Sequence, residues 1–194
     1  DSAIGGVEKV GGNSKQKNNL KTFKELFQNR WSVREYTDTK VDIKKIDAAI
    51  SLSMKTPSIC NRQSARVTVV TNSAKIEAAL KVQGGMTGYA LPPVLLMVTT
   101  DTSAFVHVTE RNQVYIDGGL FSMSLLLALE AESLAACPLN AMLSVSRDKK
   151  MREILDIPKN ENIIMFLSVG NFREDNKVPK SFRYDSGDVS RVVG

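Results

Sequence analysis

The stretch Asn112–Glu132, NQVYIDGGLFSMSLLLALEAE, is the longest helical pattern in the chain. Apolar side chains lie nearly all round its axis, and a helix of that kind belongs in a core or at an interface. Gly118 and Gly119 each cost about 1 kcal/mol inside a helix, so they predict close approach of another backbone. The fold is therefore expected to be organised around this helix.

The flanking sequence predicts further helices and several strands. Apolar residues at helical spacing, together with capping residues and helix breakers, predict helices over about 15–28, from Asp42 to Met54, from Ser73 to Lys81 and, capped by Ser146, over 147–155. β-rich or continuous apolar runs predict strands over 66–71, 94–98 and 163–169, and the glycines between 84 and 88 predict a loop. Helices alternating with central strands predict an α/β or α+β fold.

The composition is that of one globular domain. The chain has 194 residues, 42% of them hydrophobic, and a formal net charge of +5. We expect a mobile lead-in over 1–13, where four glycines occur, and a single domain over 14–194. No apolar run approaches the roughly 20 residues of a membrane span, so no membrane is expected. The basic residues suit solvated helix faces without the interleaved aromatics of a nucleic-acid site, so no nucleic acid is expected either.

Several kinds of catalytic site are missing from the sequence. There is no GxxxxGK[ST], HExxH or GxSxG motif. Cys60 and Cys137 are too far apart in the chain for a metal-type motif, and as reduced thiols they suit the cytoplasm. The sole histidine, His107, fits a surface or capping position better than a catalytic one. We therefore predict no metal and no catalytic side chain, so any chemistry depends on a bound cofactor.

Two short segments suit such a cofactor. In RWSVREY (30–36), two guanidinium groups and the Ser32 hydroxyl lie within five residues at the end of a predicted helix, and such a set can bind a phosphate. TPSICNRQ (56–63) is a turn rich in small hydrogen-bonding groups that can meet the polar edge of a planar ring. A second basic cluster, Lys177, Lys180 and Arg183, could converge on the same phosphate. The two segments indicate a phosphorylated aromatic cofactor, which we interpret as a flavin.

Two further segments are DGGLFSMSLLLALEAESLAACPLN (117–140) and IIMFLSVGNFREDNKVPKSFR (163–183). Together with RWSVREY and TPSICNRQ, they make this chain resemble the nitroreductase family of FMN-dependent NAD(P)H oxidoreductases. The resemblance covers about residues 20–185 in the same order. It implies an α+β fold with a mixed sheet flanked by helices. It also implies an intertwined homodimer with two FMN sites at the subunit interface.

The resemblance also assigns roles to named residues. Arg30 and Ser32 match phosphate and ribityl contacts, with Trp31 beside them, and Arg34 matches the cation at the N1/O2 side of the ring. Lys180 and Arg183 match phosphate contacts near the end of the chain. Pro57, Ser58, Ile59, Asn61 and Gln63 match a segment that the other subunit contributes. Pro138, Leu139 and Asn140 match a turn whose N–H groups approach flavin N5. Some members place an asparagine and a lysine at the flavin where this chain has Gly84–Gly88, so the contacts of this loop stay open.

The implied activity is a ping-pong reaction. NADH or NADPH would pass hydride to flavin N5, and a nitroaromatic, a quinone or a similar small-molecule acceptor would then take the electrons. Two alternatives remain open on the same scaffold: a specialised flavin enzyme for one metabolite, and a non-catalytic flavin-binding or regulatory protein. The acceptor, the preferred nucleotide and the flavin potential do not follow from the sequence.

Overall fold

The computed structural model describes residues 20–179 and 181–194, which belong to two units. The first unit, residues 1–30, contains the described helix α2 (Leu20–Asn29), on which the rings of Phe23 and Phe27 lie 5.8 Å apart. The start of the helix predicted from residue 15 and the lead-in 1–13 lie outside the described residues. The second unit comprises residues 31–194.

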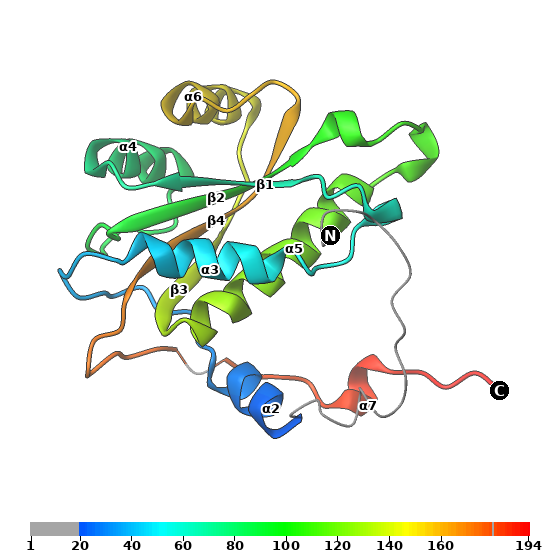
Figure 1. Ribbon diagram of the computed structural model, residues 1–194, viewed down its shortest axis with the longest axis horizontal. Coiled ribbons are helices and arrows are strands. Elements are labelled where there is room, and N and C mark those ends of the chain that lie inside the picture. Colours follow the sequence, from blue (N-terminus) through cyan, green and yellow to red (C-terminus); the bar gives the residue numbers. More distant parts are fainter. Residues whose placement is uncertain (1–19, 180) are drawn as a thin grey trace, which may run out of the picture. The chain divides into compact units, whose positions relative to one another are not determined.

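The second unit is built on a four-stranded sheet with the order β1-β2-β4-β3 (Figure 1). The strands are β1 (Ala65–Val70), β2 (Val94–Asp101), β3 (Leu134–Asn140) and β4 (Glu161–Asn171). All three pairs are antiparallel, and an isolated bridge between Ser32 and Ala136 adds a parallel contact at the outer edge of β3. The α+β fold class is confirmed. The sequence predicted three of these strands but not β3.

Helices cover both faces of this sheet (Figure 1). Helices α3 (Ile43–Ser53) and α5 (Gln113–Ala131) pack together on one face, and α4 (Ser73–Gln83) and α6 (Val145–Leu155) on the other. The shorter elements are the 3-10 turns η1 (Ile59–Asn61), η2 (Thr102–Ala104) and η3 (Val108–Glu110) and the helix α7 (Ser186–Val189).

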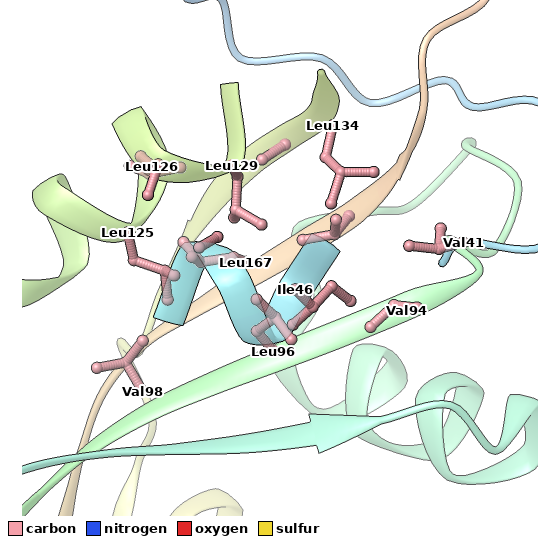
Figure 2. Packing of buried hydrophobic residues seen from close by; sticks show 14 of the residues in the cluster. Val41, Ile46, Val94, Leu96, Val98, Leu125, Leu126, Leu129, Leu134 and Leu167 are labelled. Carbon is pink, nitrogen blue, oxygen red and sulfur yellow. The ribbon is translucent and has the colours of Figure 1, made fainter. Parts of the chain in front are cut away.

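Strand β2 lies between two apolar cores, because its successive side chains point to opposite faces of the sheet. Val94, Leu96 and Val98 face α3 and α5 (Figure 2), whereas Leu95 and Met97 face α4 and α6. All five are at most 2% exposed. Full burial of such a side chain contributes about 1.5–3 kcal/mol, which explains why the run 94–98 is apolar at every position.

Two of the three predicted helix caps are wrong by one or two residues. Asp42 caps α3 as predicted, its side chain accepting a hydrogen bond from Lys44 N. The cap of α4 is Asn72, not Ser73, and the cap of α6 is Ser144, not Ser146. Each observed cap has an extended backbone and accepts from an N–H in the first turn, a geometry that a residue already inside the helix cannot adopt.

Helix α5 has 19 residues and, within the described part of the chain, is the one helix long and apolar enough to cross a membrane by length and composition alone. The expectation that no segment approaches such a length is therefore wrong for α5. Its core packing explains its composition, because α5 packs against α3, β2, β3 and β4 and buries Asp117 as well as Leu125, Leu126 and Leu129. A Cβ at Gly118 would lie 2.7 Å from Ile164 Cγ1. The absence of a side chain at Gly118 therefore makes room for the Ile164 side chain, and not for the backbone of another segment as the sequence predicted.

Candidate functional site

The segment that follows Arg30 runs along the free edge of β3. Val33 is buried, and its N–H donates to the carbonyl of Ala136 across 3.0 Å. Together with the Ser32–Ala136 bridge, this bond fixes Ser32 beside the strand. Side chains in an extended segment alternate between its two faces, so buried Val33 leaves its partly exposed neighbours Ser32 and Arg34 available to a ligand.

Tyr36 anchors the same segment to the centre of the sheet. Its hydroxyl lies 2.7 Å from the carbonyl oxygen of Val33, 2.7 Å from Ser168 Oγ and 3.0 Å from the carbonyl oxygen of Ser168. Burial raises the pKa of Tyr36 far above its ordinary value, although the hydrogen bond with Ser168 acts in the opposite direction. Tyr36 therefore stays a neutral phenol that packs and donates a hydrogen bond, as a structural residue.

Arg34 faces the loop that follows α4. Its guanidinium carbon lies 6.0 Å from the centroid of the Tyr89 ring, at the outer limit of a cation–π contact. Gln83 joins this loop to β3, since its Nε2 donates to the carbonyl of Asn140 across 3.0 Å and its Oε1 accepts from Gly85 N across 2.6 Å. The loop 84–89 and the end of β3 are thereby held together, and Arg34 is in contact with the loop.

Pro138, Leu139 and Asn140 do not form the predicted turn. They are the last three residues of β3 and pair with β4 opposite Leu167, Phe166 and Met165. The antiparallel ladder with β4 explains the difference, because it continues to Asn140. Proline has no N–H, so backbone donors in this segment come from Leu139 and Asn140 alone.

The segment 57–63 has an unusual backbone. Cys60, Asn61 and Gln63 have φ values of 48°, 54° and 49°. Left-handed conformations at residues other than glycine are uncommon, and they persist where the surroundings hold them, often at functional sites. Ser58 Oγ accepts from Gln63 N across 2.9 Å and closes the segment into a compact loop.

Helix α5 supports this loop from within the protein. The buried Asp117 carboxylate accepts from Ile59 N across 3.1 Å and from Gln113 Nε2 across 2.7 Å. A buried carboxylate needs such donors, and here they come from the loop and from the helix's own first turn. The sequence analysis missed Asp117, Gln83 and Tyr89. An acidic residue in an otherwise apolar helix was the available signal for Asp117.

A small pocket lies beside the loop, lined by Thr56, Pro57, Ser58, Gln63, Ser64 and Asp117 together with Met54, Ala65 and Phe121. It has room for about one water molecule and cannot enclose a planar ring system. Thr56 Oγ1 and Ser64 Oγ are buried there and have no hydrogen-bond partner among the described residues. Any larger ligand must therefore meet the loop on its outer surface, where Pro57, Asn61 and Gln63 are exposed.

The two segments lie far apart within one chain. One row across the sheet contains Val67, Val98, Met165 and Asn140, one residue from each strand. Three spacings between neighbouring strands therefore separate β1 from the end of β3, a distance of roughly 14 Å. The loop precedes the start of β1, whereas the Ser32 bridge lies four residues from this row in the opposite direction along β3. The structure thus brings Ser32 to the edge of β3 and Arg34 to the loop 84–89 but does not bring them to the loop 57–63.

The remaining predicted phosphate contacts are Arg30, Lys180 and Arg183. Arg30 is the last residue of the first unit, and its Nη1 is buried without a hydrogen-bond partner among the described residues. Arg183 is exposed and donates to the carbonyl of Phe182, and Lys180 lies outside the described residues. Trp31 is exposed and Ile59 half-buried.

The matching family model is described as "Nitroreductase family" and covers residues 27–87 and 88–171. These residues are most of the chain and include both candidate segments and all four strands. The chain belongs to the nitroreductase family. No curated protein matches it.

Solved structures with the same fold come from several bacteria. A nitroreductase-like protein of Streptococcus mutans superposes with a TM-score of 0.76 at 19% identity, over 90% of this chain and 99% of that one. A nitroreductase family protein of Streptococcus pneumoniae gives 0.73 at 20% identity, over 88% and 100%. An FMN-dependent nitroreductase of Clostridium difficile gives 0.68 at 20% identity, over 85% and 93%. At these identities the likeness concerns the fold.

Proposed function

We propose that this protein is an FMN-dependent oxidoreductase that uses NADH or NADPH as electron donor and reduces a small acceptor such as a nitroaromatic or a quinone. Membership of the nitroreductase family supports the oxidoreductase class. The observation that carries the cofactor assignment lies within residues 31–194, where the Ser32–Ala136 bridge and the bond from Val33 N to the Ala136 carbonyl hold the partly exposed Ser32 and Arg34 at the edge of β3. A hydroxyl and a guanidinium group are donors that suit the oxygens of a phosphorylated cofactor.

The residues present fit FMN in their chemistry. Arg30 and the Ser32 hydroxyl would bind its phosphate and ribityl chain, and Arg34 would place a permanent positive charge beside the ring. When bound, FMN supplies the two-electron redox chemistry that the side chains lack. Arg34 would favour the more negative, reduced form electrostatically. Alternate residues of β3 bond to β4, and because the Ala136 carbonyl faces Val33 on the other side, the N–H of Asn140 is the donor left to orient the ring.

A complete site would need two chains. Ser32 and the loop 57–63 lie at opposite edges of the sheet, and the pocket beside the loop is too small for a ring. The exposed face of the loop, with Pro57 and Asn61, would therefore contact FMN held by the Arg30–Arg34 segment of a partner subunit. Three large side chains of α5, those of Tyr115, Ile116 and Leu120, are each about half exposed. Exposed apolar surface of this kind supports a homodimer.

The first experiment is an absorption spectrum of the purified protein, followed by anaerobic addition of NADPH and NADH. Flavin bands that bleach with either nucleotide support the oxidoreductase, and the faster donor identifies the preferred nucleotide. Bound flavin that neither nucleotide reduces indicates a flavin-binding protein instead. A colourless protein that takes up no added FMN contradicts the proposal.

The two-chain site has its own test by complementation. Arg30→Ala and Asn61→Ala each should lower FMN occupancy, and mixed dimers of the two variants should regain about half of the sites, because one of their two sites then contains neither substitution. Mixing within one variant is the control. Mixed dimers that regain no FMN would mean that both residues act on the same chain's cofactor or on none.

A further inference from the structure

Glu110 organises the connection between β2 and α5, residues 102–111. One of its carboxylate oxygens, Oε2, accepts from Val106 N across 2.7 Å and from His107 N across 3.3 Å. These bonds fold the connection back on itself around the carboxylate. The Glu110 side chain is only 11% exposed, so it is a structural centre of the connection and not a solvated surface charge.

The other oxygen of Glu110 holds the loop 57–63. Arg62 Nη1 lies 2.5 Å from Glu110 Oε1 and also donates to the carbonyl of Ala104 across 2.9 Å. Arg62 stands between Asn61 and Gln63, the left-handed residues at the middle and end of the loop. One guanidinium group therefore joins two points of the 102–111 connection to the loop.

The position of this contact gives it a specific effect. Asp117 holds Ile59 at the beginning of the loop, and Ser58 holds Gln63 at its end. Between them, within the described residues, the Arg62 guanidinium group makes the hydrogen bonds that join the loop to another part of the chain, to Glu110 and to Ala104. Left-handed residues other than glycine return to ordinary conformations when such contacts are lost, so the ion pair bears directly on Asn61.

We propose that Arg62 and Glu110 are positioning residues, which hold the loop 57–63 in the conformation that presents Asn61 to FMN, and that the 102–111 connection thereby sets cofactor affinity. This inference rests on the proposed function for the identity of the ligand. The ion pair holds the backbone of the loop and, among the described residues of the second unit, makes no hydrogen bond to Ser32 or Arg34. Its loss therefore weakens binding without removing a cofactor contact.

The test uses Glu110→Gln, which keeps the size of the side chain, and Arg62→Lys, which keeps the charge but cannot donate to Glu110 and Ala104 in the same geometry. Asp156→Asn is the matched control, because it removes another long-range ion pair, that with Lys75 at 2.7 Å. Hydrogen exchange of the 59–63 amides in the flavin-free full chain should accelerate about five- to tenfold in both variants and not in the control. The Kd for FMN should rise by a similar factor.

A double variant, Arg62→Lys with Glu110→Gln, should be no worse than the poorer single variant, since both changes remove one contact. Unchanged exchange at 59–63 would overturn the inference directly. Faster exchange with an unchanged Kd for FMN would also overturn it, because the ion pair would then be structural without positioning the cofactor. A parent protein that binds no FMN instead defeats the proposed function, and the exchange measurement still decides whether the ion pair holds the loop.

Discussion

The ring of Tyr36 occupies the space where a side chain at Gly170 would begin. A Cβ at Gly170 would lie 2.4 Å from the ring's Cγ. Gly170 lies near the end of β4, and its missing side chain lets Tyr36 pack directly on the strand while its hydroxyl reaches Ser168. The packing of Tyr36 on β4 therefore depends on this glycine.

Gly170→Ala should destabilise the protein by about 1–3 kcal/mol, because the added methyl group would lie 2.4 Å from the ring and must displace it. Chemical denaturation measures the loss. Gly187→Ala is the control, since nothing lies within 4 Å of a Cβ at that position. Equal stability of the two variants would show that Tyr36 can leave the strand at no cost.

Asp117→Asn should loosen the start of the loop 57–63. An asparagine offers one acceptor oxygen in place of two, so Ile59 N or Gln113 Nε2 loses its partner, at a cost of about 1–3 kcal/mol. Thermal unfolding and hydrogen exchange at Ile59 measure the effect. Asp47→Asn, an exposed change on α3, should alter neither quantity.

Gln83→Glu should release the loop 84–89 from β3 at neutral pH. The new carboxylate would face the carbonyl of Asn140 where the amide now donates, an arrangement that costs about 1–3 kcal/mol. Protonation restores a donor, so the difference in unfolding free energy from the parent should shrink as the pH falls. A difference that stays constant with pH would indicate loss of packing instead. Gln28→Glu on exposed α2 is the control.

Asp101 should contribute to the acid sensitivity of the fold. Hydrogen bonds from the Ser103 hydroxyl, the Asn160 amide and Ser103 N lower its pKa below the ordinary value, against a smaller opposing effect of burial. Because the folded pKa lies below the unfolded one, the carboxylate stabilises the fold above about pH 4, and this contribution is lost as the pH falls through the folded pKa. Asp101→Asn should therefore show a shallower loss of unfolding free energy than the parent on acidification. Identical slopes would contradict this role.

Periodicity predicted the core of this fold well. The apolar run at 94–98 and the helix over 112–132 were recognised because buried strands and helices leave direct patterns of side chains. Strand β3 was missed because LAACPLN carries small residues and a proline, and its pairing comes from β4, far away in the sequence. The caps at Asn72 and Ser144 were misplaced because several neighbouring residues could serve equally well as caps.

The candidate site was only partly accessible to sequence reasoning. Arg34 and Ser32 were identified by residue type, but their position beside β3 depends on the Ser32–Ala136 bridge. The Arg62–Glu110 ion pair joins residues 48 positions apart, and no local pattern predicts such a contact. The roles at the flavin remain predictions that the measurements of FMN occupancy and of the Kd for FMN would test.

The order β1-β2-β4-β3 places the last strand of the chain between two earlier ones. During synthesis, β2 and β3 emerge from the ribosome without their common neighbour, and α5 emerges before the sheet that it covers is complete. Long-range pairing of this kind folds slowly and leaves apolar surface exposed meanwhile. The nascent chain should therefore bind chaperones until residue 171 has left the exit tunnel, and a stalled chain ending before β4 should aggregate.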